Sequence, residues 1–202
     1  MLGLTHEEAI GYCKSTGRLL VSRDGIHVRF VTGPRKALVI QTPPHLRAAS
    51  ALCLEMVNYQ QAERSFEGGL LWLGLWDGVS GIHRVGWRAL EAMRRVHGVN
   101  ASLEIAPATS FRADELVEEQ AFLTYALAFG WGGYMIPSSV PYLLDLRTSD
   151  RFFVCAETAR DLQDVGAALK AWKPVMVDES GGSANAGRGE PKRAGKRKTT
   201  IR

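Results

Sequence analysis

The chain has 202 residues, with 46% apolar side chains, 25 lysine and arginine residues against 21 acids, and a formal net charge of +4. This length fits one domain with a sizeable core, and three cysteines far apart in sequence do not suit a disulfide framework or a zinc cluster. The first residues lack the basic start and the apolar run of a secretory signal, so we expect a cytoplasmic protein.

The first 31 residues predict a helix followed by a β-hairpin. Thr5 and Glu8 have the spacing of a capping box, in which each side chain accepts a hydrogen bond from the backbone of the other at the start of a helix. Residues 18–23 and 26–31 carry alternating or β-branched side chains, and Asp24-Gly25 between them is a preferred pair for a tight turn. We therefore expect two antiparallel strands after the first helix.

A third strand and a second helix are expected next. Residues 37–41 form a short apolar run, and Thr42 followed by Pro43 has the pattern of a helix cap with proline at the first helical position. The following residues carry apolar side chains at helical spacing. Residues 68–74, an apolar run between glycines, fit either a buried strand or a loop.

The middle of the chain predicts two helices separated by a strand. Ser80 is the expected cap of an amphipathic, arginine-rich helix that ends at Gly98. Residues 101–105 are expected to form a strand. Residues 110–129 are expected to form a helix with acidic side chains near its start, where the helix dipole favours negative charge.

Three strands and a last helix complete the expected order. Thr158 with Asp161 predicts the start of the final helix. Apolar and β-branched runs between turn residues predict the strands, at 133–136, 142–146 and 151–155.

Strands that come in groups between helices favour an α+β fold over a doubly wound α/β sheet. We predict a single globular α+β domain over residues 1–176, with mixed, largely antiparallel sheets and helices packed on one face. The run from 120 to 144 carries no charge, but its glycines and prolines would interrupt a membrane-spanning helix. We expect a buried helix followed by a buried strand there, and no membrane contact.

The last residues of the chain are strongly basic. Positions 188–202 contain seven basic residues and one acid, which leaves 18 basic and 20 acidic residues in positions 1–187. A segment so poor in apolar side chains cannot offset the entropy of ordering, so we expect residues 177–202 to form a disordered tail. The tail either serves solubility alone or attracts nucleic-acid phosphates weakly and without sequence specificity. The cations for such attraction are Lys192, Arg193, Lys196, Arg197 and Lys198.

Two groups of side chains in the body are candidates for binding. Trp76 and Asp77 lie in a segment rich in tryptophan and glycine, a composition that binding surfaces and cores both use. Arg84, Arg88 and Arg95 recur at helical spacing with an acid among them. They would either contact phosphates or an acidic partner, or form a solvated helix face with local ion pairs.

Carboxylates and a thiol are the candidates for chemistry. Asp114, Glu115, Glu118 and Glu119 include two pairs at the i,i+4 spacing of metal-binding helices, but no histidine joins them, and surface acids favoured by the helix dipole are the alternative. Cys155 is expected just before a helix, whose partial positive charge would lower the pKa of the thiol. A buried structural cysteine is the alternative.

The motifs of common enzyme classes are absent. The sequence contains no GxxxxGK[ST], GxGxxG, HExxH, GxSxG or EF-hand pattern, so we expect neither a cofactor nor a metal. Our leading hypothesis is a non-enzymatic module that binds a protein partner. The alternatives are a nucleic-acid accessory protein that uses the basic tail, and a small enzyme with a thiol or carboxylate site.

Overall fold

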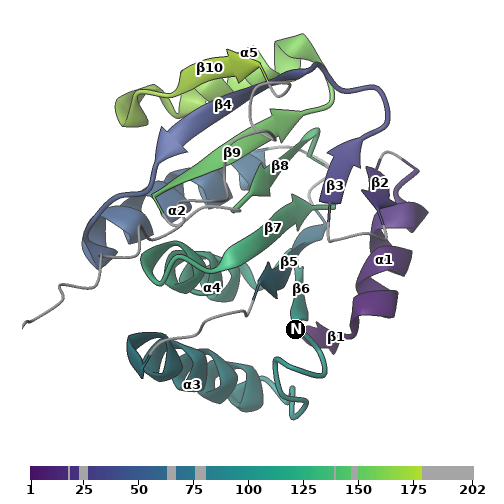
Figure 1. Ribbon diagram of the computed structural model, residues 1–202, viewed down its shortest axis with the longest axis vertical. Helices are drawn as coiled ribbons and strands as arrows, with labels where there is room; N and C mark the ends of the chain where they lie inside the picture. The colour runs from purple at the N-terminus through teal and green to yellow at the C-terminus, as the bar shows by residue number, and fades with distance from the viewer. Residues whose placement is uncertain are drawn as a thin grey trace, which may run out of the picture.

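The computed structural model describes residues 1–17, 19–22, 27–62, 67–75, 81–138, 140–146 and 150–178, with the backbone alone at residues 22, 75 and 81–84 (Figure 1). A short 3-10 helix, η1 (Lys170–Trp172), follows the last α-helix. The α-helices of the described residues are α1 (His6–Ser15), α2 (Leu46–Ala62), α3 (Gly81–Val96), α4 (Leu116–Ala128) and α5 (Ala159–Ala168).

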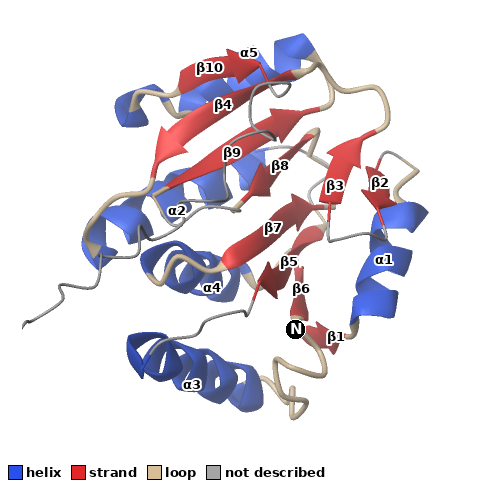
Figure 2. Cartoon of the chain, in the orientation of Figure 1, coloured by secondary structure: helices blue, strands red, loops and turns tan. Residues whose placement is uncertain are grey.

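Eight strands form one sheet in which every neighbouring pair is antiparallel (Figure 2). In spatial order they are β1 (Leu2–Leu4), β6 (Ala108–Arg112), β5 (Gly68–Leu75), β7 (Gly132–Pro137), β8 (Tyr142–Asp145), β9 (Arg151–Ala156), β4 (Lys36–Gln41) and β10 (Val175–Asp178). A separate hairpin consists of β2 (Leu19–Ser22) and β3 (His27–Phe30). The predicted α+β class with largely antiparallel pairing is confirmed.

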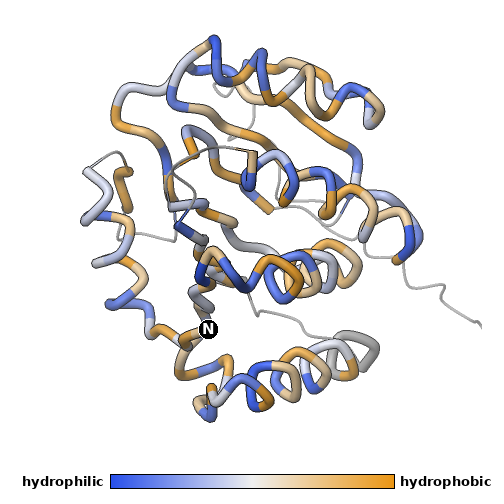
Figure 3. The backbone as a smooth tube through the Cα atoms, turned by 180° about the vertical axis from the view of Figure 1, so that it is seen from behind, coloured by the Kyte–Doolittle hydropathy of each residue, from blue (hydrophilic) through white to orange (hydrophobic). Residues whose placement is uncertain are grey.

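The sheet separates two hydrophobic cores. Helices α2, α3, α4 and α5 lie on one face of the sheet, whereas α1 and the β2–β3 hairpin lie on the other (Figure 3). The apolar side chains of the two groups belong to separate cores. Strand β5 shows the division, because Leu71 and Leu73 point toward the four helices while Leu70 and Trp72 point toward α1 and the hairpin. The expected placement of helices on one face therefore holds for α2 to α5, and α1 lies on the opposite side.

The run at 68–74, which fits a strand or a loop by sequence, forms strand β5 in the interior of the sheet. It pairs with β6 on one side and β7 on the other, so both its faces and both its edges are buried. Gly133 allows β7 to lie close to β5, since a Cβ at this position would lie 2.2 Å from the carbonyl oxygen of Trp72. An uninterrupted apolar run is what a strand buried on both faces requires.

Several local predictions are confirmed. Both capping boxes form, at Thr5 with Glu8 and at Thr158 with Asp161. The hairpin strands, β4, and the three strands after α4 lie within one or two residues of their expected bounds. The charge-free run from 120 to 144 is a buried helix followed by buried strands, as expected.

The start of α2 was predicted three residues too early. The helix begins at Leu46, because Pro43 precedes Pro44, and the residue before a proline is disfavoured in the helical conformation. Thr42 therefore does not cap the helix, and its buried hydroxyl has no hydrogen-bond partner within the described part of the chain.

The strand expected at 101–105 and the helix start expected at 110 are both wrong. Residues 103–105 form a turn, residues 108–112 form β6, and α4 begins only at Leu116. Thr109 and Phe111 face the helices while Ala108 faces the other core, an alternation that fits a strand. The serine and acids that suggested a helix start belong to the strand and to the turn after it.

The two edge strands were not predicted. β1 and β10 have three and four residues, too few for a periodic signal. Because β10 continues to Asp178, the boundary expected at residue 176 falls inside a strand. The expected hairpin turn at Asp24-Gly25, the Ser80 cap and tail residues 179–202 lie outside the described residues.

Candidate functional site

Of the ten side chains predicted to bind a partner, three belong to α3, the arginine-rich helix. Seven lie outside the described residues, namely Trp76, Asp77, Lys192, Arg193, Lys196, Arg197 and Lys198. The three on α3 are Arg84, Arg88 and Arg95, and the side chain of Arg84 is not described.

The outer face of α3 is solvated. Arg88 is exposed, and the Arg95 side chain, 63% exposed, lies 3.5 Å from Glu91 in an i,i+4 ion pair. Glu91 also accepts a hydrogen bond from the backbone N–H of Leu103. Arg88 and Arg95 start about 10 Å apart along the helix axis, at 1.5 Å per residue. Their positions suit two separate contacts better than a joint grip on one small anion.

The other tryptophans of the aromatic segment serve the cores. Trp72 is buried in the core beside α1, where its indole N–H donates to Nδ1 of His6 at 3.1 Å. Trp131 is buried in the core on the opposite face of the sheet. These two side chains therefore do not form one surface.

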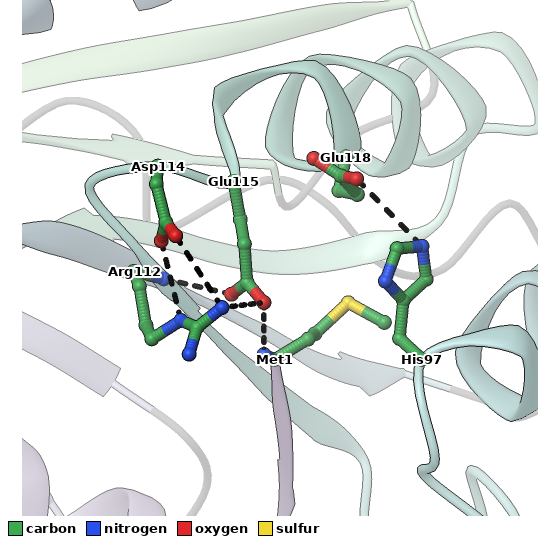
Figure 4. Close-up of polar contacts among 6 residues, drawn as sticks. All are labelled: Met1, His97, Arg112, Asp114, Glu115 and Glu118. Carbon is green, nitrogen blue, oxygen red and sulfur yellow. Dashed lines mark hydrogen bonds and ion pairs between the residues drawn. The ribbon is translucent and has the colours of Figure 1, made fainter.

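Glu115 is the centre of a polar cluster at the N-terminal end of α4 (Figure 4). Its carboxylate accepts hydrogen bonds from the α-amino group of Met1 and, at 2.9 Å, from the backbone N–H of Arg112. The Arg112 guanidinium lies 3.3 Å away. Burial alone would raise the pKa of Glu115, but these hydrogen bonds and positive charges hold it below its ordinary value. The carboxylate is ionised and committed to contacts within the chain.

The neighbouring acids are paired as well. Arg112 lies 3.2 Å from Asp114, and His97 lies 3.8 Å from Glu118 (Figure 4). Among the described residues, no three His, Cys, Asp or Glu side chains are grouped so that they could hold a metal ion. The acids of this segment do not form the dimetal arrangement that their spacing allows.

Glu119 is directed into the core. Its carboxyl group and the amide of Gln60 are completely buried, and neither has a hydrogen-bond partner by geometry within the described residues. Burial raises the pKa of Glu119 to about 8, against a smaller opposing effect of the nearby Gln60 amide. Glu119 is therefore largely protonated at neutral pH. A carboxyl group with no access to solvent cannot act on a substrate.

The thiols do not form a reactive site of the expected kind. Burial raises the pKa of Cys13 and of Cys53 to about 12, so both are protonated at neutral pH. Cys155 is half-buried and faces the core of α1 and the hairpin, whereas α5 lies on the other face of the sheet. The positive end of α5 therefore does not point at this thiol.

Arg94 is a buried cation that the sequence reasoning missed. The residue is completely buried, and its guanidinium has no hydrogen-bond partner in the described part of the chain. It lies against Gly3 of β1, where a Cβ would be 2.5 Å from the guanidinium nitrogen Nη2. Burial lowers the pKa of Arg94 to about 10, with the charge of Glu91 opposing this effect. Its position four residues after the buried Leu90 is the signal that could have revealed it.

A pocket of about 360 Å³ lies where α2 begins, α3 makes its first turns and α4 ends. Its lining is mostly apolar, and Leu46 and Val85 remain 55% and 69% exposed beside it. Figure 1 shows these three helix ends at the same end of the helical layer. The lining residues are Pro43, Pro44, His45, Leu46, Val85, Gly86, Ala89, Tyr125, Ala128 and Phe129.

Stacked aromatic rings support one wall of this pocket. The ring of Phe129 stacks on Tyr125 at 5.8 Å and 14°, and on Trp131 at 5.4 Å and 20°. Gly86 of α3 packs directly on this stack, since a Cβ there would lie 2.6 Å from two ring carbons of Phe129. The proline pair leads into α2 without backbone N–H groups that would need partners. The aromatic stack and the proline pair therefore restrict the conformations that this wall can adopt.

Comparison of the chain with family models, with curated proteins and with solved structures finds no match in any of the three. Over the described residues, no helix combines the length and the hydropathy that crossing a membrane requires.

Proposed function

We propose that this protein is a non-enzymatic module that binds a protein partner, and that the pocket between α2, α3 and α4 receives an apolar side chain of that partner. The observation that carries the proposal is the pocket itself, an apolar cavity of about 360 Å³ beside exposed Leu46 and Val85. Apolar side chains seated in well-formed pockets dominate the energy of many protein interfaces.

The candidates for chemistry support this choice over an enzyme. Glu119, Cys13 and Cys53 are buried, and Glu115 is engaged by Met1 and Arg112. The polar side chains of the pocket lining are His45 and Tyr125. Among the described residues, no acid or cysteine lines the pocket to act as a nucleophile or as a carboxylate base beside them.

Selection of a random displayed peptide library on the full chain tests the proposal. Recovered peptides should carry a large apolar residue and should lose affinity for the double variant Leu46→Gln/Val85→Gln. Removing one buried apolar contact of about 1.5–3 kcal/mol predicts a loss of roughly 10- to 100-fold. Titration of labelled synthetic peptides by fluorescence anisotropy measures it.

The chain offers a matched control. Val96 and Val117 are 84% and 75% exposed on α3 and α4 but do not line the pocket. The variant Val96→Gln/Val117→Gln should bind the peptides as the parent chain does. Equal affinity for all three proteins would show that the pocket does not receive the peptides, and the proposal would be abandoned.

A further inference from the structure

We infer that the partner segment is an acidic, amphipathic peptide, whose apolar side chain enters the pocket while its carboxylates lie over the basic rim formed by the start of α2 and by Arg88. The inference rests on the proposed function and specifies the chemistry of the partner. Its basis is the charge around the pocket.

The pocket lies at the positive end of α2. This helix begins at the pocket, whereas α3 lines it from its fifth residue, Val85, onward, and neither helix has an acidic residue in its first turn. The partial positive charge at such helix ends favours a bound carboxylate by about 0.3–1 kcal/mol each. The end of α4 at the pocket contributes partial negative charge that offsets the end of α2, so the side chains decide the net charge around the pocket.

The side-chain charges next to the pocket are mainly positive. Arg47 follows the lining residue Leu46, and Arg88 precedes the lining residue Ala89; both arginines are exposed. Asp150 and Arg151, at the start of β9, lie beside the segment that leads into α2, and their charges cancel. The described residues of the rim thus carry a net positive charge around an apolar cavity.

An apolar cavity with a basic rim favours a protein segment over a nucleic acid. A nucleic acid would use the arginines for its phosphates, but it would leave the cavity without an apolar group to fill it. A peptide with acidic and large apolar side chains satisfies both features. Complementary charge also raises the rate of association, and this gain falls as salt increases.

The test compares two charge-reversed variants of the full chain. Arg47→Glu/Arg88→Glu reverses the rim, whereas Arg29→Glu/Arg160→Glu makes the same change of charge at exposed arginines on β3 and α5. Peptides recovered from the random library on the parent chain should have a net negative charge. They should bind the rim variant at least 10-fold more weakly, bind the control within about 2-fold of the parent, and lose affinity as salt rises.

Each other outcome separates this inference from the proposed function. Neutral or basic peptides that still lose affinity for Leu46→Gln/Val85→Gln would overturn the inference and leave the pocket as a docking site. Recovery of no peptide sensitive to that variant would overturn both. Displacement of the peptides by a 20-nucleotide single-stranded DNA that binds the parent but not the rim variant would assign the rim to nucleic acid and overturn the inference.

Discussion

The two ends of α4 differ in whether their side chains are covered by partners within the chain. At the N-terminal end, Glu115 and Glu118 meet Met1, Arg112 and His97 within the chain. At the C-terminal end, the ring of Phe129 lines a pocket open between three helices. The charges at the N-terminal end of α4 are thus already paired within the chain, whereas its C-terminal end keeps an uncovered apolar surface that a partner can contact.

Glu119, in the first turn of α4, offers the largest effect. Because the pKa of Glu119 is about 8 when folded and near 4.5 ordinarily, the folded chain keeps a proton that the unfolded chain loses. The contribution of Glu119 to stability is therefore fully present below pH 4.5 and is lost as pH rises toward 8. We expect Glu119→Gln to flatten this dependence and to raise the free energy of unfolding at pH 9 by a few kcal/mol.

Urea denaturation between pH 5 and pH 9 measures the effect of Glu119→Gln. The control is Glu104→Gln, which removes the same charge from an exposed position. If the parent and Glu119→Gln keep the same difference in stability at every pH, the buried carboxyl is not the group that titrates.

At the C-terminal end of α4, Gly86 of α3 packs on the aromatic stack. Gly86→Ala would place a Cβ 2.6 Å from two ring carbons of Phe129, which is held between Tyr125 and Trp131. We expect a loss of stability of about 1–3 kcal/mol and a reshaped pocket. Gly11→Ala in α1 is the control, since nothing lies within 4 Å of its Cβ, and it should stabilise the chain by about 0.5–1 kcal/mol. Thermal unfolding of both variants measures these changes in stability. Equal stabilisation by both would contradict the packing of Gly86 on Phe129.

The cluster around Glu115 at the N-terminal end of α4 predicts a loss of stability in acid. The pKa of Glu115 is lowered, so its contribution is present above the ordinary value of 4.5 and is lost as pH falls through the lowered value. We expect Glu115→Gln to cost about 1 kcal/mol at pH 7 and to cost less in acid. Denaturation at pH 7 and pH 3 measures this, and a cost that persists unchanged at pH 3 would rule out the charge as its source.

The smallest effect concerns the exposed face of α3. The Arg95 side chain is 63% exposed in its pair with Glu91. We expect Arg95→Ala to change the free energy of unfolding by less than about 0.5 kcal/mol, and the change should shrink in 1 M salt. A larger loss in urea denaturation would mean that Arg95 has a structural contact beyond this pair.

Local patterns were predictable where the responsible residues are neighbours in sequence. The capping box of Thr5 and Glu8 forms because its partners are three residues apart. β6 was mistaken for a helix start because Ser110 and the acids after it favour a helix locally, while pairing with β5 decides the conformation. Tertiary pairing outweighs local preference at this position.

The pocket could not be predicted from the sequence. Leu46, Val85 and Phe129 come from three helices that are separated by about 40 residues at each step, and only packing brings them together. Arg94 was missed for a related reason, since its burial depends on β1, a strand with no local signal. Contacts between distant segments carry no signature in a single sequence.

The position of β4 has a consequence for synthesis. This strand lies between β9 and β10, whose residues follow it by more than 100 positions. At the usual translation rate of about 5–20 residues per second, β4 waits roughly 5–20 s for its first neighbour. During that interval the backbone groups along both edges of β4, at Leu38 and Ile40 among others, have neither β9 nor β10 to pair with. The central pairing of this part of the sheet therefore forms only when synthesis of the folded body is nearly complete.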